Sequence, residues 1–388
     1  MTPAIASKLP QVGTTIFTVM SELAVRHGAV NLGQGFPDFD PSARLQSLVA
    51  EAMRSGHNQY APLAGVRALR ERIAEKVARL YGHHYDVERE ITVSAGGTEA
   101  LMSAILAAVH PGDEVIVLEP AFDSYVPAIR LAGGTPVFVP LDRLDFGVPW
   151  DRVRAAVTPR TRLLILNSPH NPSGAAFAAS DLDELERLVQ GTGLLLLSDE
   201  VYEHLVYDGL EHQSVARRPA LAERAFVVSS FGKTFHATGW KVGYCCAPPT
   251  LTEEFRRVHQ FVVFAVSTPM QHAMAAYLDD PSVYLDLAAF YQAKRDRFAN
   301  GLASSAFRLL PCSGTFFLLA DYAAISDEPE EMFARRLTAE HRVASIPLGA
   351  LYDRPGEGPQ ARSRRIRFCF AKREATLDQA VERLLKVH

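Results

Sequence analysis

Short apolar runs alternate with amphipathic stretches from about residue 90 to residue 247, and this alternation most constrains the fold. Continuous apolar runs are typical of strands buried on both faces, as in a parallel sheet that helices cover. Seven runs occur, at 91–93, 115–118, 137–139, 163–166, 194–197, 226–228 and 242–245. The pattern therefore predicts an α/β fold with a largely parallel sheet of about seven strands.

The pattern changes after about Asp279, where a smaller α+β domain is predicted. We expect a helix at 283–303, a strand at 315–319, a helix at 332–341, a strand at 365–370 and a last helix from Ala375. The first forty residues should return to this domain, because 31–40 reads as a loop ahead of the first helix of the large domain. The predicted division is an N-terminal arm with part of the small domain (1–45), a large domain (46–280) and a small C-terminal domain (281–388).

Composition excludes several classes of protein. The chain has 388 residues, is 48% hydrophobic and 22% charged, and carries a formal net charge of -4, which argues against disorder and against a nucleic-acid partner. Its apolar runs are too short to span a bilayer, and the N-terminus lacks a hydrophobic signal core, so we expect a cytoplasmic protein without membrane contact. Without C-x-x-C spacing, the four cysteines are predicted to be reduced, buried thiols, and no metal site is expected.

Polar segments directly follow four of the apolar runs. They are 94–101, 167–174, 198–202 and 229–234. Taken singly, each is most often a turn or a helix cap. Ligands collect beyond the carboxyl ends of strands in open α/β sheets, so four such segments at one edge favour a binding site. Gly96 and Gly97 would open a helix whose free N–H groups suit a phosphate.

Lysine is rare, with only seven in the chain, and Lys233 has an unusual place. It follows a predicted buried strand, where desolvation would lower its pKa and make the amine nucleophilic. Lys76 and Lys294 are instead predicted to lie on polar helix faces.

Three other motifs fail on inspection. Ser230-x-x-Lys233 matches the acyl-enzyme serine of penicillin-binding proteins, but the required Ser-Asp-Asn and Lys-Thr-Gly do not follow it. A P-loop ending in Gly-Lys-Thr needs a glycine where Val227 stands, and a dinucleotide fingerprint needs one where Asp38 stands.

Taken together, the segments resemble the class I/II fold-type I aminotransferases that depend on pyridoxal 5'-phosphate (PLP), over nearly the whole chain. The branch is that of methionine aminotransferases and kynurenine/glutamine transaminases. The most specific stretches are 31–39, 167–174, 198–203, 229–241 and 365–370. The resemblance implies a large PLP-binding domain with a mostly parallel sheet, and a smaller α+β domain.

The resemblance also implies roles around the cofactor ring. Lys233 would hold PLP as a Schiff base and, once displaced by the substrate, move a proton from Cα to C4′. Asp199 would pair with the pyridine nitrogen. Asn171 and Tyr202 would hydrogen-bond the 3′-oxygen, and Phe122 would stack on the ring.

The phosphate would be held by the N–H groups of Gly97 and Thr98, by Ser230 and by Lys241, where several relatives carry arginine. Tyr60 matches a tyrosine that reaches the phosphate from the neighbouring subunit. This match implies a homodimer with shared active sites.

The implied substrate is a neutral amino acid, such as methionine, an aromatic residue or glutamine, which gives its amino group to a 2-oxo acid. Arg367 would hold the α-carboxylate bidentately, with Gly35 and Asn171 adding contacts. Phe17 aligns with an aromatic residue that faces the substrate side chain. Ala265 stands where eukaryotic kynurenine-type enzymes carry histidine, which favours the methionine-like branch.

Rival functions share the same catalytic residues. They are kynurenine–oxoglutarate aminotransferase, succinyl-diaminopimelate aminotransferase and a cysteine-S-conjugate β-lyase. A PLP-dependent transcription regulator would need a DNA-binding domain ahead of the catalytic pattern, whereas that pattern starts here within forty residues.

Overall fold

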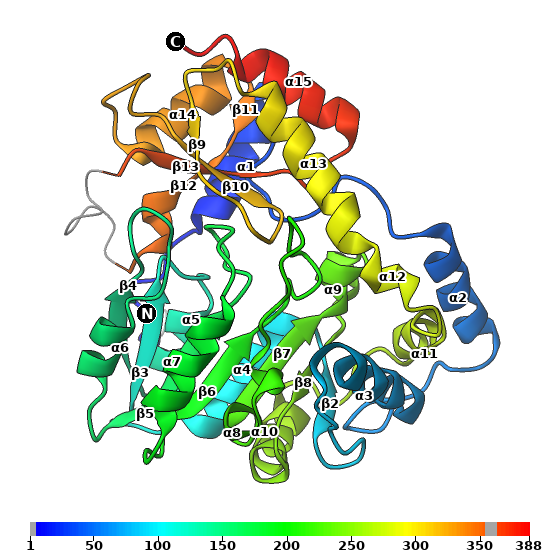
Figure 1. The fold of residues 1–388 in the computed structure, drawn as a ribbon. Coiled ribbons are helices and arrows are strands. Elements are labelled where there is room, and N and C mark those ends of the chain that lie inside the picture. Colours follow the sequence, from blue (N-terminus) through cyan, green and yellow to red (C-terminus); the bar gives the residue numbers. More distant parts are fainter. Residues whose placement is uncertain (1–4, 354–362) are drawn as a thin grey trace.

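The computed structural model describes residues 5–353 and 363–388 and is built around a seven-stranded sheet (Figure 1). Its strand order is β2-β8-β7-β6-β5-β3-β4, and β8 alone runs antiparallel to its neighbours. The strands are β2 Ile91–Ser94, β3 Glu114–Glu119, β4 Thr135–Pro140, β5 Thr161–Asn167, β6 Leu195–Asp199, β7 Ala225–Ser230 and β8 Gly243–Cys246. The predicted largely parallel sheet is confirmed, and all six parallel strands end at one edge.

Helices cover both faces of this sheet, because successive side chains of each buried strand point to opposite sides. Val115 and Val117 face a layer made of α4, α5 and α10, whereas Ile116 and Leu118 face the layer of α3, α6, α7 and α8. These helices are α3 Arg67–Tyr81, α4 Gly97–Ala108, α5 Tyr125–Leu131, α6 Trp150–Ala156, α7 Ala179–Val189, α8 Pro219–Ala222 and α10 Pro249–Val262. Predicted helical periodicity at 66–80 and 182–188 corresponds to α3 and α7.

A smaller antiparallel sheet of order β12-β13-β10-β9 lies at the other end of the molecule, with α13, α14 and α15 around it (Figure 1). Its strands are β9 Arg308–Leu309, β10 Phe317–Asp321, β12 Ile346–Pro347 and β13 Arg365–Cys369. The helices are α12 Ser282–Leu285, α13 Leu287–Gly301, α14 Glu330–Glu340 and α15 Glu374–Leu384.

The N-terminal segment joins this second region. Strand β1 (Val30–Asn31) pairs in parallel with β11 (Val343–Ala344), and α1 (Ile16–His27) also contacts β11. Helix α2 (Ala43–Arg54) packs instead on α11 (Thr268–Tyr277). The division at residues 45 and 280 stays a prediction.

Two predicted elements differ in detail. The single helix expected at 283–303 is two helices, α12 and α13, which meet at Asp286. The strand expected at 315–319 begins only at Phe317, because Thr315 has a φ of 62° and therefore leaves the extended conformation.

The prediction of polar helix faces for Lys76 and Lys294 was wrong, because both lysines are buried. Lys76 Nζ lies 2.5 Å from a carboxylate oxygen of Glu203, which also accepts hydrogen bonds from Tyr81 and Tyr244. Burial raises the pKa of Glu203, but Lys76, His204 and Ser229 together outweigh this effect, and the pKa falls below its ordinary value.

The four cysteines are free and buried, as predicted.

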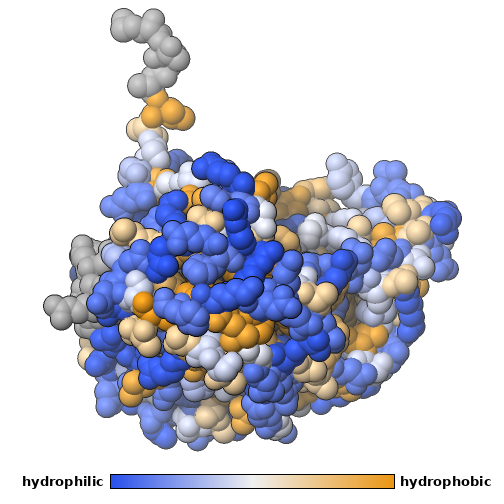
Figure 2. Space-filling model, turned by 90° about the horizontal axis from the view of Figure 1, so that it is seen from above, coloured by the Kyte–Doolittle hydropathy of each residue, from blue (hydrophilic) through white to orange (hydrophobic). Residues whose placement is uncertain are grey.

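Seen from above, the surface is mostly hydrophilic, with apolar residues in small scattered groups (Figure 2). In the described ranges 5–353 and 363–388, no helix is both long and apolar enough to cross a bilayer.

Candidate active site

A cavity of about 270 Å³ lies between the carboxyl edge of the large sheet and strands β10 and β13 of the small one. Every predicted site residue except Tyr60 lines it. These residues are Phe17, Gly35, Gly97, Thr98, Phe122, Asn171, Asp199, Tyr202, Ser230, Lys233, Lys241 and Arg367. Residues up to 350 positions apart in the sequence are therefore brought together around one cavity.

Lys233 sits in a short helix, α9 (Phe231–Thr234), directly after β7. Its Nζ donates a 3.0 Å hydrogen bond to the carbonyl oxygen of Gly35 and faces the ring of Tyr202. Burial lowers the pKa of Lys233 to about 8. The amine is thus much closer to its neutral, nucleophilic form at physiological pH than an exposed lysine.

Asp199 closes the deep end of the cavity at the end of β6. Its carboxylate accepts a 2.6 Å hydrogen bond from the hydroxyl of Tyr125 and a 3.3 Å bond from the N–H of Val201. Burial nevertheless raises the pKa of Asp199 to about 6, because no cation is in direct contact with it among the described residues. A buried carboxylate in this state is suited to a cationic ligand.

The wall at the start of α4 suits an anion. Gly96 has a φ of 81°, which favours glycine, and Gly97 is the first residue of the helix. A Cβ placed on Gly96 would lie 3.2 Å from Lys241 Nζ, so the ammonium approaches the free N–H groups of the helix start. Ser230 and Thr98 line the same wall.

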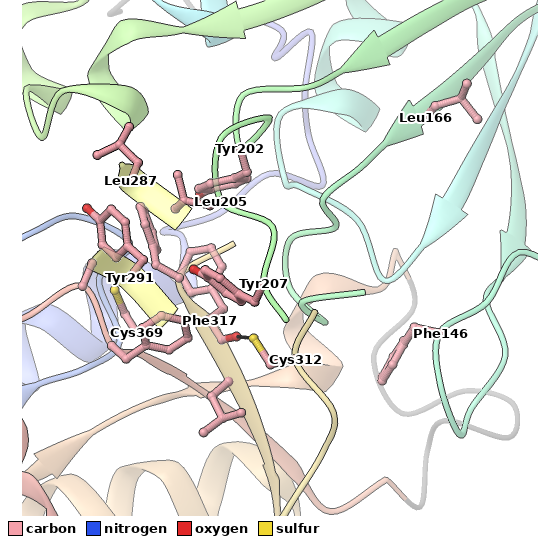
Figure 3. Packing of buried hydrophobic residues seen from close by; sticks show 14 of the residues in the cluster. Phe146, Leu166, Tyr202, Leu205, Tyr207, Leu287, Tyr291, Cys312, Phe317 and Cys369 are labelled. Atoms are coloured by element: carbon pink, nitrogen blue, oxygen red, sulfur yellow. Dashed lines mark hydrogen bonds between the residues drawn. The ribbon is translucent and has the colours of Figure 1, made fainter. Parts of the chain in front are cut away.

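Asn171 and Tyr202 occupy the side of the cavity nearest the small sheet. Asn171 is anchored by its backbone N–H, which donates to Asn167 Oδ1 at 2.8 Å. Tyr202 is buried and packs edge-on against Phe316 and Phe317, with ring centroids 5.0 and 5.9 Å away. Figure 3 shows Tyr202, from the turn after β6, close to Phe317 of β10.

Arg367, on β13, is 1% exposed and points into the cavity from the small sheet. Nη1 donates to Asn171 Oδ1 at 2.7 Å and Nη2 to the carbonyl oxygen of Gly33 at 3.1 Å. The guanidinium lies 3.8 Å from the ring centroid of Phe317 and 5.2 Å from that of Phe17.

Arg367 makes no ion pair with a carboxylate among the described residues, although the charge of Asp123 acts on it from across the cavity. Burial lowers its pKa to about 10, and Nε has no hydrogen-bond partner in the part of the chain that the structure describes. A Cβ on Gly35 would lie 2.8 Å from Cζ of Phe317, the ring that stacks on the guanidinium, so glycine leaves room for this ring. Arg367 is therefore prepared to bind an anion.

Tyr60 lies outside the cavity of its own chain. Its side chain is 83% exposed and meets Phe264 edge-on with ring centroids 5.1 Å apart. The predicted contact with a phosphate thus needs a second subunit and stays a prediction.

Sequence reasoning missed three residues at this site, two that line the cavity and one that contacts Asp199. Asp123 lies in the same loop as Phe122, Tyr125 begins α5 directly after that loop, and Phe317 stacks on Arg367. The signal available for the first two was their place directly after β3, at the same carboxyl edge as the recognised motifs. Phe317 gave no such signal, because it reads as an ordinary core residue of a strand.

The comparisons with known proteins agree with this geometry. Residues 28–384 match the family model for aminotransferase class I and II. A methionine aminotransferase of Escherichia coli (strain K12) is 50% identical over 379 residues, 97% of each chain. A probable N-succinyldiaminopimelate aminotransferase of Mycobacterium tuberculosis is 41% identical over 386 residues, also 97% of each chain.

Solved structures show the same likeness. The crystal structure of a methionine aminotransferase from Escherichia coli matches with a TM-score of 0.96 and 50% identity, covering 99% of this chain and 100% of the other. Together with the family match over most of the chain, this shows that the protein belongs to the class I and II aminotransferases.

Proposed function

We propose that this aminotransferase binds PLP in the cavity and moves the amino group of a neutral amino acid, such as methionine, to a 2-oxo acid. The observation that carries the proposal is the arrangement of Lys233, Asp199 and Arg367 around one cavity beside the start of α4. The 50% identity to a methionine aminotransferase supports the same reading.

The described residues fit PLP, on which this family generally depends. Asp199, which is buried without a cation in contact among the described residues, would pair with the protonated pyridine nitrogen, and the start of α4 with Lys241 would hold the phosphate. Lys233, with a pKa of about 8, provides the amine that attaches the aldehyde. PLP, when bound, accepts the electrons that are released when the Cα–H bond of the substrate breaks.

Each side chain then has a defined task. Lys233 Nζ would take the proton from the substrate Cα and deliver it to C4′ of the cofactor. Asp199 would keep a proton on the pyridine nitrogen, and the hydroxyl of Tyr125 holds the Asp199 carboxylate in place. Arg367 orients the α-carboxylate, so that the Cα–H bond faces Lys233.

Aromatic rings form the walls that meet the substrate side chain. Phe17, Phe122 and Phe317 all line the cavity. Apolar walls of this kind suit methionine, phenylalanine or the aliphatic part of glutamine better than a charged side chain.

We also propose that the enzyme is a homodimer with shared active sites. Tyr60 lies edge-on against Phe264, which is 51% exposed, and Phe261, three residues earlier than Phe264 in the chain, is 86% exposed. Large apolar side chains exposed together are typical of a surface that a partner covers.

The four free, buried cysteines support a reducing compartment, and we propose the cytoplasm.

A screen of amino donors against several 2-oxo acids tests the function. Methionine with a 2-oxo acid should give 4-methylthio-2-oxobutanoate and the acceptor's amino acid in equal amounts. A β-lyase would instead release pyruvate and ammonia from a cysteine conjugate without consuming an acceptor. Kynurenine and N-succinyl-diaminopimelate belong in the screen as rival donors, and a preference for either would replace methionine in the proposal.

A further inference from the structure

Asp123 places a carboxylate in the same cavity. It lies in the loop between β3 and α5, directly after Phe122, where it lines the cavity and is exposed to solvent. Surrounding protein atoms raise the pKa of Asp123, and Arg367 opposes the shift only in part. Among the residues that the structure describes, no side chain donates a hydrogen bond to this carboxylate. Its own backbone N–H does so, and Arg367 is the cation that acts on it.

One charged side chain of the cavity has no ligand assigned to it by the proposed function. Lys233, Lys241, Arg367, Asp199 and Asp123 are the lysine, arginine and carboxylate side chains that line the cavity in the described chain. Under the function proposed above, the first four meet the cofactor or the substrate α-carboxylate. Asp123 has no such ligand. Arg367 is the single arginine that lines the cavity among the described residues. A second carboxylate on the substrate would therefore meet the negative charge of Asp123, and no further cation of the described cavity lining would be available to bind it.

We propose that Asp123 is a specificity-determining residue that excludes substrates with a second carboxylate. This inference rests on the proposed function and deepens it, because it names the class of both substrates. Donors are neutral amino acids, and acceptors are neutral 2-oxo acids, with 2-oxoglutarate and oxaloacetate disfavoured. Like charges brought together in a partly desolvated site discriminate strongly between partners of similar shape.

Glutamine and glutamate provide the sharpest pair of probes, since they have nearly the same shape and differ in charge. The wild-type enzyme should prefer glutamine in kcat/KM. Asp123→Asn should lower the glutamine/glutamate ratio on the order of 10-fold or more, mainly through faster use of glutamate. Asp123→Glu should keep the wild-type preference, because it keeps the charge.

Asp151→Asn is a matched control, because it removes one carboxylate whose side chain is 106% exposed on α6, away from the cavity. It should leave the ratio unchanged. The proposal is overturned if Asp123→Asn shifts the ratio no more than this control, or if it slows both donors equally. A wild-type preference for glutamate would overturn it as well.

A binding measurement separates this inference from the function on which it rests. Glutarate and its monoamide, glutaramate, should compete with substrate analogues for the cavity, and calorimetry gives their dissociation constants without turnover. The glutaramate preference should fall on the order of 10-fold in Asp123→Asn. If wild type transaminates no neutral donor but this binding shift is found, the proposed function fails while the exclusion of a second carboxylate stands. Asp123→Ser repeats the measurement should the asparagine variant not fold.

Discussion

The hydroxyl of Tyr125 donates a 2.6 Å hydrogen bond to Asp199 Oδ2 at the buried end of the cavity. Tyr125 is the start of α5, whereas Asp199 ends β6, so the bond fixes the carboxylate between two elements. The two hydrogen bonds that Asp199 accepts, from Tyr125 and from the N–H of Val201, do not compensate the burial of a full charge, and the pKa of Asp199 stays raised to about 6. The charged form of Asp199 therefore lowers the stability of the folded protein at neutral pH.

Asp199→Asn should stabilise the cofactor-free protein while it abolishes activity. The pKa of Asp199 is 3.8 ordinarily and about 6 when folded, so the folded state binds more protons between these values and stability falls as the pH rises through them. At pH 8 the variant should exceed the wild type by about 1–3 kcal/mol in the free energy of unfolding. Urea unfolding should show this gain shrinking as the pH falls toward 4, and a constant difference would contradict the assignment.

Lys233 should react as a neutral amine at lower pH than other lysines. Since burial lowers its pKa to about 8, labelling of the cofactor-free protein by an amine reagent should rise with pH and level off above that value. Exposed Lys8 serves as the internal reference in peptide mapping. In the loaded enzyme, borohydride should fix the cofactor on the Lys233 peptide with loss of visible absorbance, and a label on Lys241 instead would show that the wrong lysine was chosen.

The sequence predicted the sheet and the edge that carries the site because both follow from local patterns. Short apolar runs mark strands buried on both faces, and parallel strands bring the polar segments after them together, as with Asn171, Asp199 and Lys233. Their assignment to PLP chemistry came from the resemblance to a family and not from the pattern.

Contacts between distant segments could not be predicted in this way. Helical periodicity treated Lys76 as a residue of a polar face, because its partner Glu203 lies 127 positions away. Tyr125 and Asp199 are 74 positions apart, and a single chain gives no signal that pairs them. The late start of β10 depended on the backbone conformation of Thr315, which its residue type does not encode.

Lys76→Met should destabilise the protein strongly, because it leaves the Glu203 carboxylate buried without its cation. Loss of one partner of a buried pair costs about 3–5 kcal/mol, and Lys76→Met combined with Glu203→Gln should cost less than the two single changes together. Urea unfolding of all four proteins gives this coupling. Arg67→Met, in the exposed pair with Glu71, is the control and should change stability far less.

Phe17→Ala should act selectively on large donors. Phe17 lines the cavity and also lies against Arg367, so its loss should slow all donors somewhat, and methionine and phenylalanine more than alanine. Arg367→Ala should instead lower kcat/KM for every donor on the order of 10- to 100-fold, since each has the same α-carboxylate. Equal slowing of alanine and methionine by Phe17→Ala would rule out its contact with the side chain.

Mixing two defective proteins should restore activity if the active sites are shared. A Tyr60→Phe subunit lends its altered residue to the site of its partner, so a heterodimer with Lys233→Ala has both defects in one site and none in the other. The exposed position of Tyr60, outside its own cavity, leads to this expectation. Activity should rise above both parents after subunit exchange. Activity that equals the sum of the parents, with heterodimers present by native mass spectrometry, would mean that Tyr60 serves no neighbouring site.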